Sequence, residues 1–538
     1  MLTLEQKKEK LRLLRKKRIL KCRSNFWDFQ KNNAPDDFKD ERTYLICLSL
    51  CLQSFYEDRP ISYLANHPIE HHEKLDLSAT TIPILFEEKG EKTLFTVDCS
   101  GIDILLIEVP RRHHKSHTLI NFECWMFGQD PMNIVVTAAH NAALANEFSQ
   151  YVRDGIEEQR LKAFNIIYSD IFPKTRTKHG DRSKTRWSLD CNYLSYAGSG
   201  ILFPPTGKGG SLGVFDDPIR GPKEAFNEDH RSKVWTAYST GWLPVLEGDK
   251  KHIFVMTPWC EEDPGDRIIK DEDGTGQKVG IFNCTCYTPE QGMLCEEILD
   301  KRAYDILEKR MDPVIFSGNF KSKRIPMAGR LYTKFNRYTV DDLPENFDEL
   351  FCYIDTADQG TDYLAAVVVG IVRGKDEFGL PIKKAYVLDI YYTKDGMEIT
   401  EPETARFLIK NHIQKGMKVM IESNAGGRGF ARSVERILRE KYQAESKGIF
   451  IEWFHQSSNK VARINTESHI IMNYFYFPAD AQSRNKYWYD AMEHLRKYSK
   501  EGKNENDDIE DCLTGISEHK VNTELTMLDA LRLRKLMN

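Results

Sequence analysis

Short apolar runs alternate with helix-like stretches in the first half of the chain, and this alternation constrains the fold more than any other feature. Helix-like stretches follow the first two runs. The runs have the length and continuous apolar character of buried strands: Ile104–Val109, Ile134–Thr137, Leu212–Phe215 and Ile253–Met256. Strands that alternate with helices predict an α/β fold with a parallel sheet.

The second half follows a different pattern. Three β-rich runs with turn residues between them come first, and antiparallel hairpins fit them. Helix-like and strand-like stretches then alternate. The β-rich runs are Leu350–Asp355, Leu364–Val372 and Ala385–Thr393, and the later stretches are Pro402–Gln414 (helix), Lys418–Glu422 (strand), Phe430–Tyr442 (helix) and Ile449–Trp453 (strand). This pattern predicts a mixed sheet.

Breakers near residues 325–345, among them Pro326, Gly329 and Pro344, interrupt the periodicity between the halves. The 538 residues and an apolar content of 41% are sufficient for two domains with separate cores. We predict the following segments: a basic N-terminal helix (1–24), a first domain (25–325), a linker (326–345), a second domain (346–520) and a C-terminal tail (521–538).

Overall charge does not identify a partner, since 76 basic against 81 acidic residues give a net charge of −5. The first 23 residues differ, with ten Lys/Arg and two Asp/Glu. They predict a solvated amphipathic helix or a contact with a partner or DNA. The 12 Cys form no CxxC pair, which favours reduced thiols. Without a secretory signal or an apolar run of about 18 residues, we expect no membrane association.

The strand Ile104–Val109 ends in the loop Pro110-Arg111-Arg112-His113-His114-Lys115-Ser116, and a helical run follows. A strand, a tight loop, Lys-Ser and a helix N-terminus are the parts of a phosphate cradle. Lys115 would reach the β- and γ-phosphates of a nucleotide, and the Ser116 hydroxyl would bind Mg²⁺.

The phosphate loop lacks the glycines of GxxxxGKS, and Pro110 and His114 stand in their places. His114 must therefore adopt a negative φ or carry strain. A basic, partly exposed loop remains an alternative. A metal site formed by His113, His114 and His117 is another, although no nearby carboxylate or Cys completes its ligands.

The strand Leu212–Phe215 ends in two carboxylates, Asp216 and Asp217. In P-loop ATPases such a strand places one carboxylate on Mg²⁺ and the next on the attacking water. Asp216 would be the metal ligand and Asp217 the general base. An ordinary Asp-Asp-Pro turn is the alternative. Thr257, after the neighbouring strand, is placed to sense the γ-phosphate.

Carboxylates in the second half also lie at element ends. Asp355 and Glu422 end strands, whereas Asp507, Asp508 and Asp511 begin a helical stretch within one turn of each other. This order suits an RNase H-like fold in which clustered carboxylates hold two divalent cations about 3.5–4 Å apart. Solvated acids at element ends, or helix capping by the last three, are the alternatives.

The quoted residues carry a resemblance to a known family. Residues 25–267 resemble the ATPase domain of the large terminase subunit, the DNA-packaging motor of tailed bacteriophages, and residues 346–520 resemble its nuclease domain. The matching stretches are Asn25–Phe29, Phe38–Arg42, the phosphate loop, Trp187–Leu189, Phe215–Pro218, Thr257–Trp259, Asp355–Asp358, Glu422–Asn424, Asn459–Lys460 with Arg463, and Asp507–Asp511.

The resemblance implies a P-loop (ASCE-type) ATPase domain with an N-terminal helical lid over 25–325 and an RNase H-like nuclease domain over 346–520. It also implies ATP and Mg²⁺ as cofactors, with Mn²⁺ able to replace Mg²⁺ in the nuclease. Lys460 and Arg463 would lie near DNA phosphate or form surface ion pairs, and Asp389 is a weaker metal candidate. The implied nucleotide-binding residues are Arg111, Arg112, His114, Lys115, Ser116, Asp216 and Thr257; the catalytic residues are Asp217, Asp355, Glu422 and Asp508; the metal ligands are Ser116, Asp216, Asp355, Glu422, Asp507, Asp508 and Asp511.

The implied function is ATP-driven translocation of double-stranded DNA into a procapsid, with endonucleolytic cutting of concatemeric DNA. Expected partners are DNA, a small terminase subunit, a portal protein and further copies of the chain in a ring. The expected location is the host cytoplasm during virion assembly, and not the mature virion. A helicase-nuclease of DNA repair or defence is an alternative, although no helicase motif is found. A DNA-binding scaffold with an inactive nucleotide site is another.

Overall fold

The computed structural model describes residues 4–68, 75–160, 165–180, 183–205, 209–248, 250–271, 273–326, 329–356, 363–413, 416–422, 427–456, 459–500, 504 and 506–522. Most of the expected C-terminal tail lies outside these residues. Within them, no helix has both the length and the apolar character needed to cross a membrane. The chain divides into two compact units, Met1–Tyr304 with Val314–Ile325, and Asp305–Pro313 with Pro326–Asn538.

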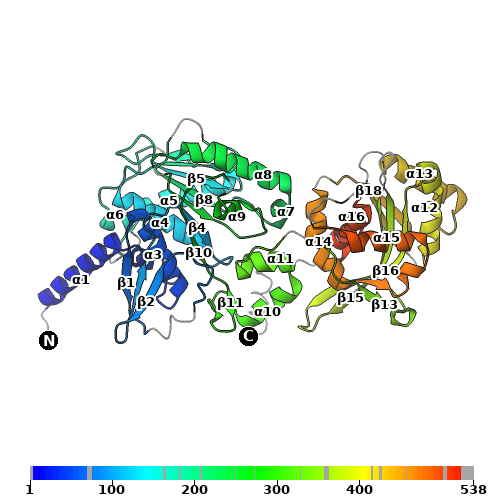
Figure 1. Ribbon diagram of the computed structural model, residues 1–538, viewed down its shortest axis with the longest axis horizontal. Coiled ribbons are helices and arrows are strands. Elements are labelled where there is room, and N and C mark those ends of the chain that lie inside the picture. Colours follow the sequence, from blue (N-terminus) through cyan, green and yellow to red (C-terminus); the bar gives the residue numbers. More distant parts are fainter. Residues whose placement is uncertain are drawn as a thin grey trace. The chain divides into compact units, whose positions relative to one another are not determined.

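The described part of the first unit combines helices with a seven-stranded sheet, a three-stranded sheet of order β1-β3-β2 and the two-stranded sheet β11-β12 (Figure 1). Its helices are α1 (Leu4–Ser24), α2 (Phe26–Asn33), α3 (Thr43–Glu57), α4 (Lys115–Gln129), α5 (Ala142–Ile156), α6 (Tyr168–Ile171), α7 (Pro222–Ala225), α8 (Glu228–Thr236) and α9 (Pro264–Ile269); α10 (Lys301–Arg310) and α11 (Pro313–Phe316) span the points of division. Its strands are β1 (Ile61–Ala65), β2 (Ile84–Glu88), β3 (Thr93–Val97), β4 (Ile104–Glu108), β5 (Val135–Ala139), β6 (Arg186–Trp187), β7 (Tyr196–Gly200), β8 (Leu212–Asp216), β9 (His252–Val255), β10 (Val279–Asn283), β11 (Tyr287–Thr288) and β12 (Gly292–Met293).

The large sheet has the strand order β10-β4-β9-β8-β5-β7-β6. Its strands are parallel except for the edge strand β6, which runs antiparallel to β7. The four predicted strands are β4, β5, β8 and β9, and they are neighbours at the centre of this sheet. The expected α/β fold with a parallel sheet is therefore confirmed.

Helices bury both faces of this sheet, because successive side chains of a strand point to opposite faces. On one face Leu105 and Ile107 of β4 pack in the same core as Trp125 of α4. On the other face Leu106 packs in the same core as Trp235 of α8. Burial on both faces explains why these strands are apolar throughout and do not alternate with polar residues.

The second unit is built around one seven-stranded sheet of order β13-β19-β16-β15-β14-β17-β18. Its strands are β13 (Asn336–Tyr338), β14 (Glu349–Asp355), β15 (Leu364–Lys375), β16 (Pro381–Thr393), β17 (Met417–Glu422), β18 (Ile449–Phe454) and β19 (Phe475–Pro478), and its helices are α12 (Met397–Asn411), α13 (Gly427–Lys441), α14 (Lys460–Tyr474), α15 (Lys486–Lys497) and α16 (Asp508–Ile516). Strands β14, β15 and β16 are antiparallel to one another, whereas β17 and β18 continue the sheet parallel to β14. The expected mixed sheet is confirmed.

The two faces of this sheet are covered by different helices (Figure 1). Helices α12 and α13 pack on the face that carries Cys352 and Ile354 of β14. Helices α14, α15 and α16 pack on the face that carries Phe351 and Tyr353. Helix α16, the last α-helix of the described chain, thus lies directly against the inner strand β14.

The boundary between the units differs in detail from the expected linker 326–345. Residues Asn336–Tyr338 form β13, which pairs with β19 in the second sheet. The segment Asp305–Pro313, expected in the first domain, groups with the second unit. A three-residue strand between breakers shows no periodicity, so the sequence could not reveal it.

Close approach of α16 to β14 depends on Gly515. A Cβ atom at this position would lie 2.1 Å from Cζ of the Tyr353 ring, well inside van der Waals contact. Both residues are buried, so neither can move into solvent. A side chain at residue 515 would therefore push the helix off the strand.

We predict that Gly515→Ala lowers the free energy of unfolding of the second unit by about 1–3 kcal/mol, as overpacking of a core does. Denaturant unfolding of the full chain measures the change. Gly429→Ala in α13 is the matched control, because nothing lies within 4 Å of its Cβ position and alanine favours a helix. Equal stability of the Gly515→Ala and wild-type proteins would contradict the predicted clash.

Candidate functional site

The phosphate loop connects β4 to α4, and its backbone is strained where the sequence lacks glycine. Arg112 and His114 have φ of 65° and 61°, in the left-handed region. Of the two outcomes expected for His114, the structure shows the strained one. Histidine tolerates this region better than most residues. The side chains of Arg111 and Arg112 are exposed on the loop.

Lys115 is the first residue of α4, and its buried side chain reaches across the ends of two strands. Its Nζ lies 2.8 Å from Oδ1 of Asp217 and 3.5 Å from Oγ1 of Thr257. The backbone N–H of Thr257 donates to the same Asp217 oxygen at 3.1 Å. Because β9 lies between β4 and β8, parallel pairing brings these three sequence-predicted residues together.

Asp216, the last residue of β8, is buried below this group. Burial and the adjacent Asp217 raise its pKa to about 7, while Lys115 and a hydrogen bond with Ser116 oppose the rise. Its Oδ1 atom is buried and has no hydrogen-bond partner. A buried oxygen without a partner is costly unless something binds it. A divalent cation held by Ser116 and Asp216 fits this atom, since Mg²⁺ prefers oxygen ligands.

A buried ionic group lies behind the phosphate loop, and the sequence analysis did not identify it. Arg324 bonds to Glu108, the last residue of β4, and its Nε donates to Oδ1 of Asp263 at 2.9 Å. Oδ2 of Asp263 accepts a hydrogen bond from the backbone of Trp259, two residues after Thr257. Only the uninterrupted apolar strand before Glu108 hinted that this carboxylate is buried.

The acids of the second unit gather at the carboxyl ends of β14 and β17. The parallel register pairs Ile354 with Ile421, so Asp355 and Glu422 follow side by side. Helix α16 adds Asp511, and one oxygen from each of the three lies within 4.8 Å of the others. Three converging, buried carboxylates form a site that suits hard divalent cations.

The third acid in this cluster is Asp511, whereas the sequence analysis left Asp507, Asp508 and Asp511 open as metal ligands and named Asp508 as the catalytic one. Asp508 accepts a hydrogen bond from the backbone N–H of Tyr363 at 3.1 Å. Burial raises the pKa of Asp511 to about 7, although Arg463 and Lys460 oppose this effect. Burial also raises the pKa of Asp355 well above its usual value, and the neighbouring acids add to the rise.

Lys460, the first residue of α14, places its ammonium group among these acids. Its Nζ lies 2.8 Å from Asp507, 3.0 Å from Asp355, 3.2 Å from Asp508 and 3.7 Å from Asp511. Burial alone would lower the pKa of Lys460, but the surrounding carboxylates raise it. Lys460 is therefore an internal counter-ion to the acid cluster.

Arg463 and Tyr353 hold the carboxylates from behind. Arg463 is 1% exposed, and it donates to Asp511 and to Glu518, each at 2.9 Å. The ion pairs of Arg463 are therefore buried, and the expectation that it forms a surface ion pair is wrong. The hydroxyl of Tyr353 donates to Oε1 of Glu422 at 2.5 Å. The sequence analysis missed Tyr353 because it looks like any apolar strand residue.

Asp389, the weaker candidate, lies outside the acid cluster and has a structural environment. Its carboxylate accepts hydrogen bonds from Lys410 at 2.7 Å, Asn411 at 3.1 Å and Trp488 at 3.2 Å. These partners satisfy the buried acid without a metal.

Comparison with known proteins gives matches in structure only. No protein-family model matches the chain, and no curated protein matches it in sequence. The large terminase of a thermophilic bacteriophage is similar at 11% identity and a TM-score of 0.43, over 78% of this chain and 95% of that chain. Structures of the same phage terminase in complex with ATP-γ-S or ADP are similar as well.

Two further structures are similar. The large terminase of bacteriophage HK97 matches at 12% identity and a TM-score of 0.29, over 70% of this chain and 82% of that chain. The Mn-soaked human cytomegalovirus terminase nuclease domain matches at 11% identity and a TM-score of 0.26, over 36% of this chain and 92% of that chain. The chain is thus similar in structure to large terminases over most of its length and to a terminase nuclease domain over about a third of it.

Proposed function

We propose that this chain is a phage large terminase subunit that couples ATP hydrolysis to translocation of double-stranded DNA into a procapsid and cuts concatemeric DNA. One observation carries the proposal. The same chain holds a lysine, a threonine and paired carboxylates at the strand ends of one unit, and a buried cluster of three carboxylates at the strand ends of the other. The first set suits phosphoryl transfer and the second suits metal-dependent cleavage of a phosphodiester.

Lys115 and Asp217 would change partners when ATP binds. Without nucleotide, the two charges neutralise each other at 2.8 Å. The phosphates compete for Lys115, and its departure frees the Asp217 carboxylate to accept a proton from the attacking water. The backbone N–H of Thr257 would remain hydrogen-bonded to Asp217, while its hydroxyl would lose Lys115 as a donor. Thr257 would therefore sense the movement of Lys115 to the phosphates. Mg²⁺ held by Ser116 and Asp216 would supply positive charge to the β- and γ-phosphates.

The carboxylates of the second unit are positioned before any substrate arrives. Tyr353 fixes Glu422, and Arg463 fixes Asp511. The parallel register of β14 and β17 fixes the position of Asp355 beside Glu422. Two divalent cations, Mg²⁺ or Mn²⁺, would activate water and stabilise the leaving oxygen of the phosphodiester. Lys460 lies among these acids, beside Asp508, and bound cations would replace its ammonium group as the positive charge of the cluster.

The proposed partners follow from the proposed activity. Cutting at a phosphodiester carries no base information, so double-stranded DNA would be taken with little sequence preference. A small terminase subunit would select the DNA, a portal protein would receive it, and copies of the chain would form a ring. The expected place of action is the host cytoplasm during virion assembly.

Removal of the phosphate-loop lysine tests the first activity. We predict that Lys115→Ala and Asp217→Asn each lower the rate of ATP hydrolysis by about 100-fold or more. Asp217→Asn should bind ATP at least as tightly as the wild type, because the neutral amide no longer holds Lys115. Steady-state turnover and nucleotide titration measure both effects.

The exposed Lys174 provides the control, since Lys174→Ala removes a lysine of the same unit outside the phosphate loop. A Lys115→Ala protein that hydrolyses ATP at the wild-type rate would rule out the phosphate-loop assignment and favour a scaffold with an inactive nucleotide site.

Removal of a metal ligand tests the second activity. We predict that Glu422→Gln abolishes Mn²⁺-dependent DNA cutting and leaves ATP turnover unchanged, because the two sets of residues lie in different units. Glu452→Gln on the neighbouring strand β18 is the matched control, with a side chain 61% exposed. Plasmid cleavage and ATPase assays on the same preparations decide the matter. Loss of both activities in folded Glu422→Gln protein would mean one shared site.

Lys460 offers a test that needs no substrate. We predict that Lys460→Met, which leaves several acids without their counter-ion, lowers the stability of the metal-free protein by something on the order of 1–3 kcal/mol, allowing for partial exposure. Mn²⁺ should then raise the melting temperature of the variant more than that of the wild type. Lys486→Met, at the first residue of α15, is the control. Equal melting temperatures in EDTA and equal Mn²⁺ shifts would contradict the role of Lys460 as a counter-ion that a cation replaces.

A further inference from the structure

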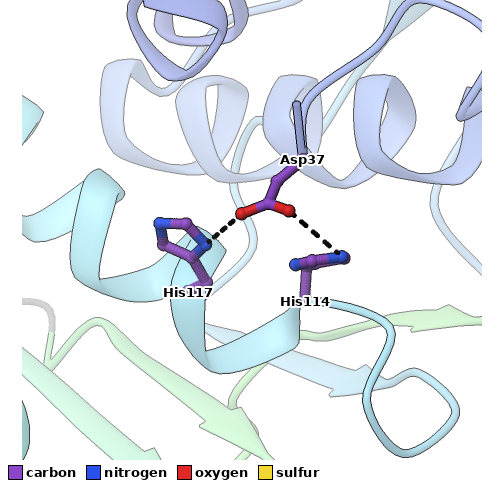
Figure 2. A group of neighbouring side chains, drawn as sticks. All are labelled: Asp37, His114 and His117. Carbon is purple, nitrogen blue, oxygen red and sulfur yellow. Dashed lines mark ion pairs between the residues drawn. The ribbon is translucent and has the colours of Figure 1, made fainter. Parts of the chain in front are cut away.

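Two histidines of the phosphate-loop region face a carboxylate from a distant part of the chain (Figure 2). His114 precedes α4 and His117 lies in its first turn, so the two imidazoles share one side of the helix. Asp37 lies between α2 and α3. Its oxygens are 3.5 Å from Nδ1 of His117 and 4.0 Å from Nε2 of His114.

We propose that Asp37, His114 and His117 bind a transition-metal dication, with Zn²⁺ as the best fit. One ligand atom from each residue lies within 4.8 Å of the others. In a tetrahedral zinc site, bonds of about 2.0–2.2 Å place ligand atoms about 3.3–3.6 Å apart. Small side-chain rotations close this difference. Two imidazoles and one carboxylate select Zn²⁺ over Mg²⁺, which prefers oxygen ligands alone.

This site shares His114 and His117 with the one considered in the sequence, but Asp37 takes the place of His113. His113 is fully buried and has other partners, with Nδ1 3.0 Å from the carbonyl oxygen of Arg111 and Nε2 3.9 Å from Sγ of Cys286. The missing carboxylate is supplied by Asp37, whose approach depends on the packing of α2 and α3 against α4. The fold therefore completes a set that the local sequence leaves incomplete.

The three side chains are restrained but accessible. The ring of Phe38 packs 6.2 Å from the His114 ring and 5.2 Å from the His117 ring, measured between centroids, which limits their rotation. Asp37 and His117 are 40% and 39% exposed, so an ion can enter from solvent. Three protein ligands leave a fourth position for water.

The positive charge of Arg42 lies beside the proposed metal ligands and lowers their affinity for a cation. Its Nη1 lies 3.1 Å from Nε2 of His114 and donates to the Asp37 carbonyl oxygen at 2.6 Å. Its Nη2 donates to Glu297 at 2.9 Å. A bound ion would take the His114 nitrogen, while Arg42 keeps its other two partners. The nearby positive charge weakens binding, so we expect a reversible site and not a permanent structural one.

Occupation would link two parts of the first unit. Asp37 belongs to the helical segment before the large sheet, whereas His114 and His117 flank Lys115 and Ser116. A bound ion would therefore restrain the start of α4 against that segment. The inference goes beyond the proposed function and does not depend on it, because it concerns binding of the metal alone.

Zinc titration of the full chain tests the proposal. Glu422→Gln is introduced throughout, so that the carboxylate cluster of the second unit contributes less to the signal. Isothermal titration with Zn²⁺ then compares this parent with added His117→Ala or Asp37→Asn. Each should weaken binding by about 100-fold or more, since changes to outer groups alone cost about 10- to 100-fold. His179→Ala, which removes an exposed histidine elsewhere, is the control and should match the parent.

Diffraction locates the ion directly. A crystal soaked in Zn²⁺ should give an anomalous peak at the zinc edge within bonding distance of Asp37, His114 and His117. The proposal is overturned if His117→Ala and Asp37→Asn both bind Zn²⁺ as the parent does. It is equally overturned if the peak appears only between Asp355, Glu422 and Asp511. Circular dichroism confirms that each variant is folded, and Asp37→Asn conserves the shape of a partly exposed side chain.

Discussion

Parallel pairing of neighbouring strands determines where chemistry can occur in both units. Parallel strands end at the same edge of a sheet, so residues that are distant in sequence meet there. In the first unit this edge joins Lys115, Asp217 and Thr257. In the second, the pairing of β14 with β17 sets Asp355 beside Glu422. The helices bury the faces of both sheets, and Lys115, Asp216, Asp355 and Glu422 at these edges are buried as well, which strengthens the charge interactions among them.

Both sites use a lysine as a counter-ion. Lys115 neutralises Asp217, and Lys460 neutralises the acids around Asp355. An uncompensated buried charge is strongly destabilising, so each lysine stabilises a fold that buries several acids at one edge. The difference lies in what must replace it. In the proposed function a nucleotide would attract Lys115 away from Asp217, whereas cations near Asp355 would take over the role of Lys460.

The sequence predicted the architecture well because long apolar runs and their alternation with helices reflect burial directly. It also placed Asp355 and Glu422 at strand ends, and the register then brings them together. The sequence could not show which acid of α16 joins Asp355 and Glu422, because tertiary packing decides which face of the helix turns toward them. Burial of Arg463 and the approach of Asp37 to the phosphate loop depend on the same packing, so neither could be predicted.

The ionic group of Arg324, Glu108 and Asp263 has a mechanical consequence. Arg324 comes just before the residues where the chain passes from the first unit to the second. Its guanidinium is fastened to the last residue of β4, from which the phosphate loop departs, and through Asp263 to the backbone beyond Thr257. Arg324, at the start of this connection, is therefore held on two sides of the sheet edge that carries Lys115, Asp217 and Thr257. A displacement of that edge would therefore move the start of the connection directly, through the hydrogen bonds of Arg324.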